Sequence, residues 1–195
     1  WRPANLMTDG RINISSTALI IADFYKDMMG TIPHSIERNV LDNTQKLQKA
    51  ARQSGMLICY SATVFRPGYI EISDRNKTFS QRKNSGQPAV SDPIEVIHPG
   101  VSPIDGEVVV GKHRVNALYG TDLDMTLRAN QINTIIILGY ATSGVVLSTT
   151  RFAADSDYSI IIVEDCCADT DPEVHNFLME KIFPRQADVV TSVDM

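Results

Sequence analysis

The sequence predicts an α/β fold, a three-layer α/β/α sandwich of Rossmann-like type with a mostly parallel, roughly six-stranded sheet. The first observation is that short apolar runs alternate along the chain with longer segments of helical periodicity, which is typical of βαβ units. The second is size, because 195 residues with 43% apolar and 21% charged side chains suit one domain with a full core. Since no repeat or linker divides the chain, we treat residues 1–195 as a single domain.

Six apolar runs are the predicted strands. The clearest is residues 134–138, which are all apolar or β-branched and too short to suggest a helix. A run of this kind, buried on both faces, belongs at the centre of a parallel sheet. The predicted strands, in order, are residues 17–23, 56–63, 107–111, 134–138, 159–164 and 188–193.

Four segments are the predicted helices, and each has a boundary signal. Gly55 ends the first, Thr121 is a candidate N-cap for the second, Thr142 or Ser143 for the third, and Pro172 occupies the first turn of the fourth. The first, second and fourth cover residues 36–54, 121–130 and 171–183, and the third follows the strand at 134–138.

Two segments have no predicted regular structure. Residues 1–16 form a polar N-terminal arm, and residues 64–99 form a long loop rich in proline and glycine. A loop of that length inside a compact domain is usually functional or disordered. We expect it to cover the ends of the first strands or to reach a partner subunit.

Composition excludes several classes of protein. A formal charge of −5 disfavours nucleic acid as the partner, and no apolar run approaches the ~20 residues that cross a bilayer. Three cysteines without zinc-type spacing give neither a disulfide framework nor a metal site, which favours a reducing, cytoplasmic location. The chain begins at Trp1 rather than Met, which leaves open that a leader was removed.

Three predicted strands lead into residues suited to chemistry. Asp23 ends the first strand, Lys112 follows the third, and the turn at residues 140–145 follows the fourth. Carboxyl ends of parallel strands meet at one edge of a sheet, where open α/β folds place their ligands. Burial would raise the pKa of Asp23 while a nearby lysine would lower it, so the sequence leaves the sign of the shift open. A carboxylate held near neutrality can act as a general acid or base.

The order of these motifs resembles that of the isochorismatase-like hydrolases, a superfamily that also contains nicotinamidases and carbamoylases. The resemblance extends over residues 17–195 and includes the stretches Phe65-Arg66-Pro67-Gly68, Lys112-His113-Arg114-Val115, Gly120-Thr121-Asp122-Leu123-Asp124 and Glu164-Asp165 followed by Ala168-Asp169. It implies an Asp–Lys–Cys triad, of which Asp23 and Lys112 match the first two members. The position of the nucleophile is occupied by Val145, which has none.

Two functions remain open. Branches of this family without the cysteine suggest a hydrolase for a small molecule, with isochorismate as the named candidate, in which Asp23 protonates an enol ether and no covalent intermediate forms. The alternative is a catalytically inactive member that binds a ligand or a partner protein. Ser143 and Ser148 lie near the missing nucleophile, but a helix cap and a helix-face residue are the better interpretations.

The resemblance also implies the surroundings of the site. A cis peptide between Tyr140 and Ala141 would aim the amides of Ala141 and Val145 at an anion, and assembly into a dimer or tetramer is expected. No cofactor is expected, and no metal, because the four histidines have no ligand spacing. Arg66 and Arg114 are candidates for substrate carboxylates, although surface salt bridges explain them equally well. The remaining predicted substrate contacts are Phe24, Phe65, Tyr140, Ser143 and Gly144.

Overall fold

A computed structural model describes residues 12–195, and the N-terminal arm predicted for residues 1–16 lies largely outside that range. Within it, a six-stranded sheet has the order β3-β2-β1-β4-β5-β6, and every neighbouring pair is parallel. This confirms the predicted α/β fold with a parallel sheet. The strands are β1 (Thr17–Ala22), β2 (Leu57–Thr63), β3 (Val108–Lys112), β4 (Thr134–Tyr140), β5 (Ser159–Ala168) and β6 (Asp188–Val190).

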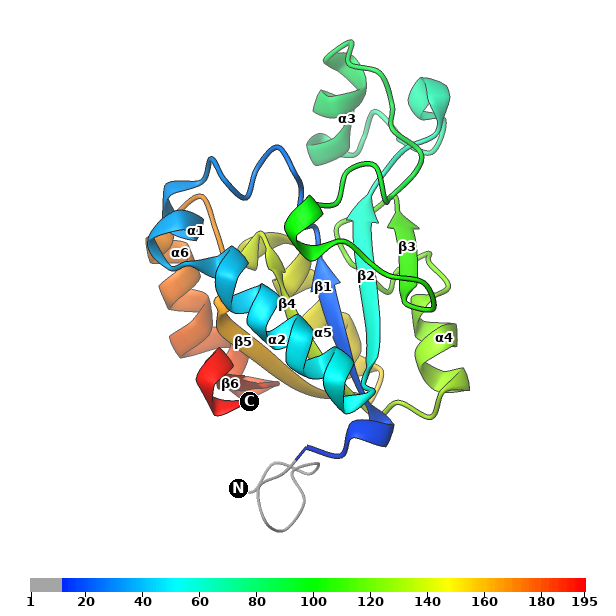
Figure 1. Cartoon of the computed structure of the whole chain (residues 1–195). Coiled ribbons are helices and arrows are strands. Elements are labelled where there is room, and N and C mark those ends of the chain that lie inside the picture. The colour runs from blue at the N-terminus through cyan, green and yellow to red at the C-terminus, as the bar shows by residue number, and fades with distance from the viewer. Residues whose placement is uncertain (1–11) are drawn as a thin grey trace.

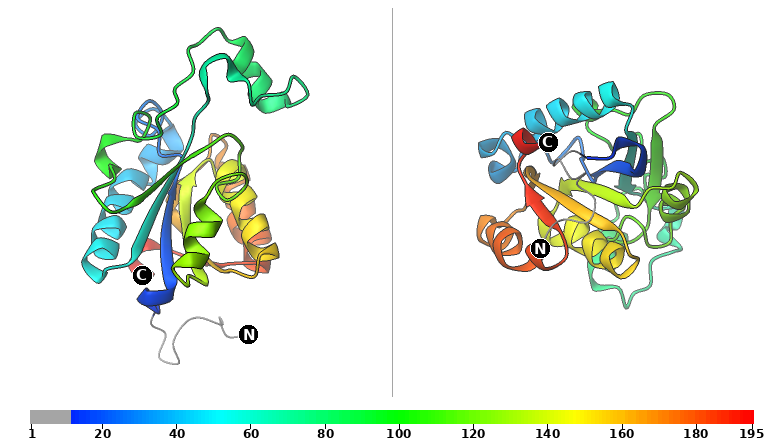
Figure 2. Two further views of the ribbon diagram at one scale, coloured as in Figure 1. Left: turned by 90° about the vertical axis from the view of Figure 1, so that its right-hand side faces the viewer. Right: turned by 90° about the horizontal axis from the view of Figure 1, so that it is seen from below.

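Helices cover both faces of the sheet (Figures 1 and 2). One face is covered by α1 and α2, and the opposite face by α4, α5 and α6. The α-helices are α1 (Pro33–Glu37), α2 (Val40–Ser54), α3 (Lys77–Asn84), α4 (Leu123–Ala129), α5 (Leu147–Asp155) and α6 (Pro172–Phe177). Across residues 12–195, no helix has the length and apolar character needed to span a membrane.

The core is centred on the two middle strands. Every residue of β1 and of β4 is buried, because helices pack over both faces of these strands. This explains why the two strands read as unbroken apolar runs in the sequence, without the polar alternation of a strand that has one face in water. The carboxyl ends of β1, β2, β3 and β4 consequently meet at one edge of the sheet, beside the segment that carries α3 (Figure 1).

Several predicted boundaries were wrong. The single helix expected at residues 36–54 is divided by Asn39, whose left-handed backbone (φ 52°) separates α1 from α2. Strand β4 continues through Gly139 and Tyr140, and β5 extends to Ala168, so that the Cys166-Cys167 pair lies within the strand rather than after it. The helix expected at 171–183 leaves α-helical geometry after Phe177, and the last strand ends at residue 190.

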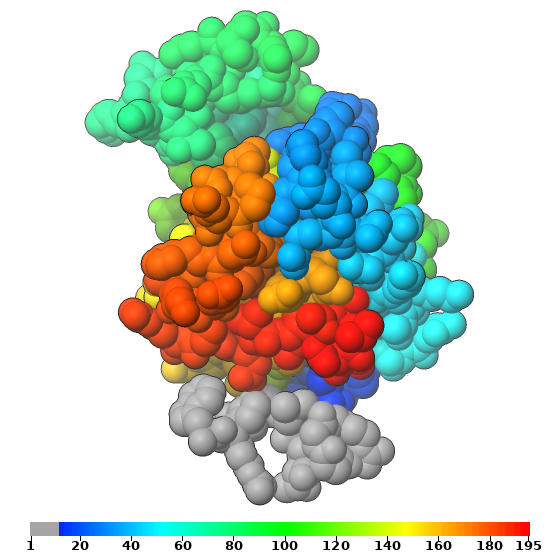
Figure 3. Space-filling model, turned by 90° about the vertical axis from the view of Figure 1, so that its left-hand side faces the viewer, coloured from blue at the N-terminus to red at the C-terminus, as the bar shows by residue number. Residues whose placement is uncertain are grey.

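The segment predicted as a loop at residues 64–99 contains helix α3, which the sequence interpretation missed. The segment projects beyond the sheet (Figures 1 and 3). It has a small apolar cluster of its own, separate from the main core, formed by Phe65, Tyr69 and Ile72 with Phe79 and Ala89 packed against them. This cluster orders a segment whose proline and glycine content suggested an irregular loop.

Candidate active site

Asp23 and Lys112 form a buried ion pair at the carboxyl edge of the sheet. Asp23 directly follows β1 and has a left-handed backbone (φ 56°), while Lys112 is the last residue of β3. Their strands are separated only by β2. The Lys112 Nζ lies 2.7 Å from the Asp23 Oδ2, and the two side chains are 1% and 8% exposed. The predicted convergence of these two groups is therefore what the structure shows.

Every polar atom of the pair has a partner within the protein. Besides Asp23, the Lys112 ammonium donates to the Thr63 Oγ1 at 2.5 Å and to the backbone carbonyl of Arg114 at 3.2 Å. The Asp23 Oδ1 accepts from the Tyr25 hydroxyl at 2.6 Å and from the Thr63 N–H at 3.1 Å. The three donors of an ammonium and both oxygens of the carboxylate are thus used, as burial of two charges requires.

Burial dominates the electrostatics of the pair. It raises the pKa of Asp23, while the attraction and hydrogen bond of Lys112, the hydroxyl of Tyr25 and the amide of Thr63 act in the opposite direction. Burial likewise lowers the pKa of Lys112 against the attraction of Asp23. The direction of the Asp23 pKa shift, which the sequence left open, is therefore upward. A raised carboxyl pKa favours a group that can donate a proton.

The turn after β4 carries the predicted cis peptide bond between Tyr140 and Ala141. It leads into a π-helical turn, Thr142–Val146, before α5 begins. Gly139 allows the approach to this turn, since a Cβ atom at that position would lie 2.3 Å from the carbonyl oxygen of Ala22 in β1. Only glycine fits against the neighbouring strand at this distance.

The N-cap predicted for this helix was wrong. Neither Thr142 nor Ser143 caps it, because the Thr142 hydroxyl bonds to the Nδ1 of His175 at 2.8 Å. The Ser143 N–H donates to the Oδ2 of Asp169 at 2.7 Å. Side chains from the ends of β5 and α6 therefore hold the turn in place, and the two hydrogen bonds span more than twenty residues of sequence.

A buried histidine pair lies behind the turn. The rings of His34 and His175 pack edge to face with centroids 4.8 Å apart, and the Asp169 N–H donates to the Nδ1 of His34 at 3.3 Å. Burial, with the nearby Arg38 and His34 charges, lowers the pKa of His175 to about 4. His175 is consequently neutral at pH 7 and serves as a hydrogen-bonding partner of the turn.

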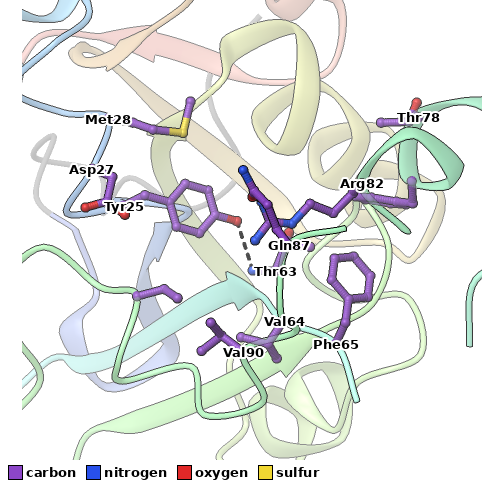
Figure 4. A pocket seen from close by; sticks show the side chains of 12 residues that line it. Tyr25, Asp27, Met28, Thr63, Val64, Phe65, Thr78, Arg82, Gln87 and Val90 are labelled. Atoms are coloured by element: carbon purple, nitrogen blue, oxygen red, sulfur yellow. Dashed lines mark hydrogen bonds between the residues drawn. The ribbon is translucent and has the colours of Figure 1, made fainter. Parts of the chain in front are cut away.

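A cleft of about 570 Å³ lies between the end of the sheet and α3 (Figure 4). Tyr25 and Thr63, which contact the Asp23 carboxylate together with Lys112, both line it. Arg82 is the only cationic side chain of the described chain that lines this cleft, and it extends from α3 to a hydrogen bond with Gln87. The apolar part of the lining consists of Met28, Val64, Phe65, Phe79, Val90 and Val96.

Comparison with known proteins identifies the family. Residues 17–194 match the family described as Isochorismatase domain. The chain belongs to the isochorismatase family. It is 31% identical over 180 residues to the uncharacterised isochorismatase family protein YwoC of Bacillus subtilis, covering 92% of each chain. It is 30% identical over 152 residues to the N-carbamoylsarcosine amidase of an Arthrobacter species, covering 77% of this chain and 57% of the amidase.

A solved structure supports the same assignment. An isochorismatase family protein from Burkholderia thailandensis superimposes with a TM-score of 0.79 at 27% identity, covering 93% of this chain and 94% of that one. The resemblance that the motifs indicated is therefore confirmed for the fold and for the family. As an isochorismatase-family chain, the protein is a relative of hydrolases that act on small molecules.

The residue that the sequence resemblance places at the family's nucleophile position has a buried side chain. Val145 is 1% exposed and belongs to the main core, and it is not among the residues that line the cleft. The three cysteines are fully buried within strands, Cys59 in β2 and Cys166 and Cys167 in β5. Burial raises the pKa of Cys59 and of Cys167 to about 12, which leaves their thiols protonated at pH 7.

The two predicted carboxylate-binding arginines are engaged inside the protein. Arg66 lies 3.8 Å from Glu71 and is largely exposed, and Arg114 donates to the carbonyl oxygens of His113 and of Glu71. Neither lines the cleft described above. The contact of Arg66 agrees with the alternative interpretation, a surface salt bridge, whereas Arg114 makes hydrogen bonds to backbone carbonyls.

Of the other predicted substrate contacts, one lines the cleft and the rest do not. Phe65 lines the cleft, whereas Phe24 is buried in the main core. Tyr140 is also buried, while Ser143 is exposed and Gly144 half-buried on the turn. No cluster of three or more metal-binding side chains occurs within residues 12–195.

Sequence interpretation missed most residues of the cleft, among them Tyr25 and Arg82. Tyr25 stands two positions after Asp23, and this proximity was the available signal. The sequence does not show that Asp23 has a left-handed backbone, and this conformation brings the Tyr25 hydroxyl to the Asp23 carboxylate. Arg82 carried no comparable signal, because it lies in a helix that was not predicted.

Proposed function

We propose that the protein hydrolyses a small anionic enol ether, with isochorismate as the named candidate, and that it does so without a cysteine nucleophile. The observation that carries the proposal is the buried contact of 2.7 Å between Lys112 and an Asp23 carboxyl group whose pKa is raised. Enol-ether hydrolysis needs an acid and an electrostatic setting but no covalent intermediate. Val145 provides no nucleophile at the family position.

The reaction balances with these groups. A proton from the Asp23 carboxyl group is added to the vinyl carbon, which leaves an oxocarbenium ion on the adjacent carbon. Water attacks that carbon and returns one proton to the carboxylate. The resulting hemiketal then collapses: its bond to the ring oxygen breaks, its hydroxyl loses a proton to form the ketone of pyruvate, and the ring oxygen gains a proton. The products are pyruvate and the ring alcohol. The Lys112 ammonium stabilises the carboxylate in the interval when it is ionised.

The cleft suits a substrate of this class. Its apolar lining can contact a ring, and Arg82 offers a guanidinium to a carboxylate, for which its planar donors are well matched. We propose this arginine for the role for which the sequence offered Arg66 and Arg114 as candidates. A relative such as the N-carbamoylsarcosine amidase indicates a different bond, but amide hydrolysis in that manner would require a nucleophile that Val145 lacks.

The test is release of pyruvate from isochorismate by the purified protein, followed with a coupled dehydrogenase. We expect Asp23→Asn to lower the rate about 10²–10⁴-fold, because it removes the acid with little change of shape. Asp155→Asn is the matched control, since Asp155 is exposed at the end of α5. Iodoacetamide should leave the rate unchanged. Loss of activity on alkylation, or full activity in Asp23→Asn, would contradict the proposed mechanism.

The alternative is a ligand-binding member without catalysis. The observation that favours it is the burial of Val145 at the nucleophile position, together with an Asp23 carboxylate whose oxygens already have partners. In that case the unmodified protein would release no pyruvate. It would still show a rise in melting temperature with a small carboxylate such as benzoate, and Arg82→Met would abolish that rise.

A further inference from the structure

The route from the Asp23 carboxylate to the cleft passes through Tyr25. The carboxylate itself does not line the cleft of about 570 Å³, whereas the phenol of Tyr25 does (Figure 4). The phenolic oxygen lies 2.6 Å from the Oδ1 of Asp23, a short contact for two oxygens. A proton that leaves Asp23 toward a molecule in this cleft therefore meets the Tyr25 oxygen first.

The hydrogen bonds around the phenol allow it to accept one proton while it donates another. The backbone N–H of Thr63 donates to the Tyr25 oxygen at 3.0 Å and also to the Asp23 Oδ1 at 3.1 Å, so one amide holds both oxygens together. A phenol has one donor and two acceptor sites. In the structure the phenol donates its hydrogen to the Asp23 Oδ1. With one acceptor site used by Thr63, the other can accept the proton of a neutral Asp23, and in that state the phenolic hydrogen can turn toward the cleft.

We infer that Tyr25 is a catalytic residue, which transfers the proton between Asp23 and the substrate in the cleft. This inference rests on the proposed hydrolysis and adds to it the group that touches the substrate. The phenol gives its hydrogen to the vinyl carbon as it receives the Asp23 proton, so Asp23 becomes a carboxylate paired with Lys112 and the phenol stays neutral. When water attacks, its proton returns to Tyr25 and the phenolic hydrogen passes back to Asp23.

The neutrality of the phenol agrees with its surroundings. Burial and the adjacent Asp23 raise the pKa of Tyr25 well above its usual range, so a free phenolate does not form near pH 7. The group therefore acts by passing one proton on while it receives another. A relay of this kind keeps the charge on the carboxylate, where the Lys112 ammonium at 2.7 Å stabilises it.

The first experiment compares pyruvate release by Tyr25→Phe, Asp23→Asn and the double variant. A relay predicts a loss of about 10²–10⁴-fold in kcat for Tyr25→Phe, and a double variant no slower than the slower single one, because the two groups act as a unit. Tyr119→Phe is the matched control, since that side chain is 58% exposed. Unchanged kcat in Tyr25→Phe, or losses that multiply in the double variant, would overturn the relay and leave the proposed hydrolysis standing.

A second experiment needs no substrate. 3-Fluorotyrosine is incorporated at position 25 alone, and its ¹⁹F resonance is followed against pH in the otherwise native protein and in Asp23→Asn. We expect a pH-dependent shift that Asp23→Asn abolishes. If the unmodified protein releases no pyruvate but this coupling is present, the substrate is wrong and the relay stands. A resonance that is indifferent to the Asp23 substitution would contradict the relay whatever the substrate is.

Discussion

Replacing His175 by glutamine should change how the stability of the protein depends on pH. The ring of His175 is 1% exposed and bonds to the Thr142 hydroxyl at 2.8 Å, and glutamine can supply a similar hydrogen bond without titrating. Burial first, then the charges of Arg38 and His34, lower the pKa of His175 from 6.5 to about 4 against the opposing effect of Asp169. The unfolded chain therefore binds this proton before the folded protein does as the pH falls.

The sign and size of the effect follow from this difference. A group whose folded pKa lies below its unfolded value contributes stability above pH 6.5, and that contribution is lost as the pH falls to about 4. A gap of about 2.5 pH units corresponds to at most about 3 kcal/mol in the free energy of unfolding. The pKa of His34 is also lowered, mainly by burial, so it acts in the same direction in both proteins.

The assay is urea unfolding at pH 7 and at pH 4.5. Relative to the unmodified protein, His175→Gln should lose less stability between the two conditions, by up to about 2.4 kcal/mol, because pH 4.5 lies above the folded pKa of about 4. His98→Gln is the control, because His98 lies in a turn outside this cluster and caps the N–H of Gly100. Equal losses in the unmodified protein and in His175→Gln would refute the assignment of a buried, neutral His175.

Three further predictions concern the ion pair, the thiols and the assembly. Lys112→Met should lower the free energy of unfolding by about 3–5 kcal/mol at pH 7, and combining it with Asp23→Asn should recover most of that loss, as urea titrations of both variants would show. Ellman's reagent should find no reactive thiol in the native protein and three after unfolding, because Cys59, Cys166 and Cys167 are buried. Light scattering at micromolar concentration should give the mass of a dimer or tetramer, and a monomer mass would contradict this.

The strands, and the charged residues at their ends, could be predicted because their causes are local. A run such as residues 134–138 can bury itself only in the middle of a parallel sheet, and a charge placed directly after such a run needs a partner. The sequence placed Asp23 and Lys112 at the ends of the first and third strands, and the observed strand order β3-β2-β1 brings them together at one edge of the sheet. The family motifs added the cis peptide bond at Tyr140, which residue pattern alone does not indicate.

The errors have causes that lie far away in the sequence. Thr142 is a suitable N-cap by residue type, but His175, 33 positions later, takes its hydroxyl. Helix α3 has only one large apolar side chain, Phe79, and its ordering depends on packing against Phe65. Its N-cap Asn76, which accepts from the Phe79 N–H at 3.1 Å, was the one local signal. A single sequence shows the preference of a residue for a local structure, but it does not show the long-range contact that overrides this preference.

The arrangement around Asp23 is more than an ion pair needs. Two buried opposite charges add little net stability, because their attraction is offset by the cost of removing them from water. A purely structural pair would be satisfied by Lys112 and by the Thr63 amide. Here a third group, the Tyr25 hydroxyl, contacts the carboxylate at 2.6 Å and also faces a cleft that Arg82 lines. The contacts therefore run from the ammonium through the carboxylate and the phenol to the cleft, which is the arrangement that the proposed proton transfer needs. The family resemblance places Val145 at the nucleophile position, and the proposed hydrolysis accordingly depends on proton transfer by these residues rather than on a covalent intermediate.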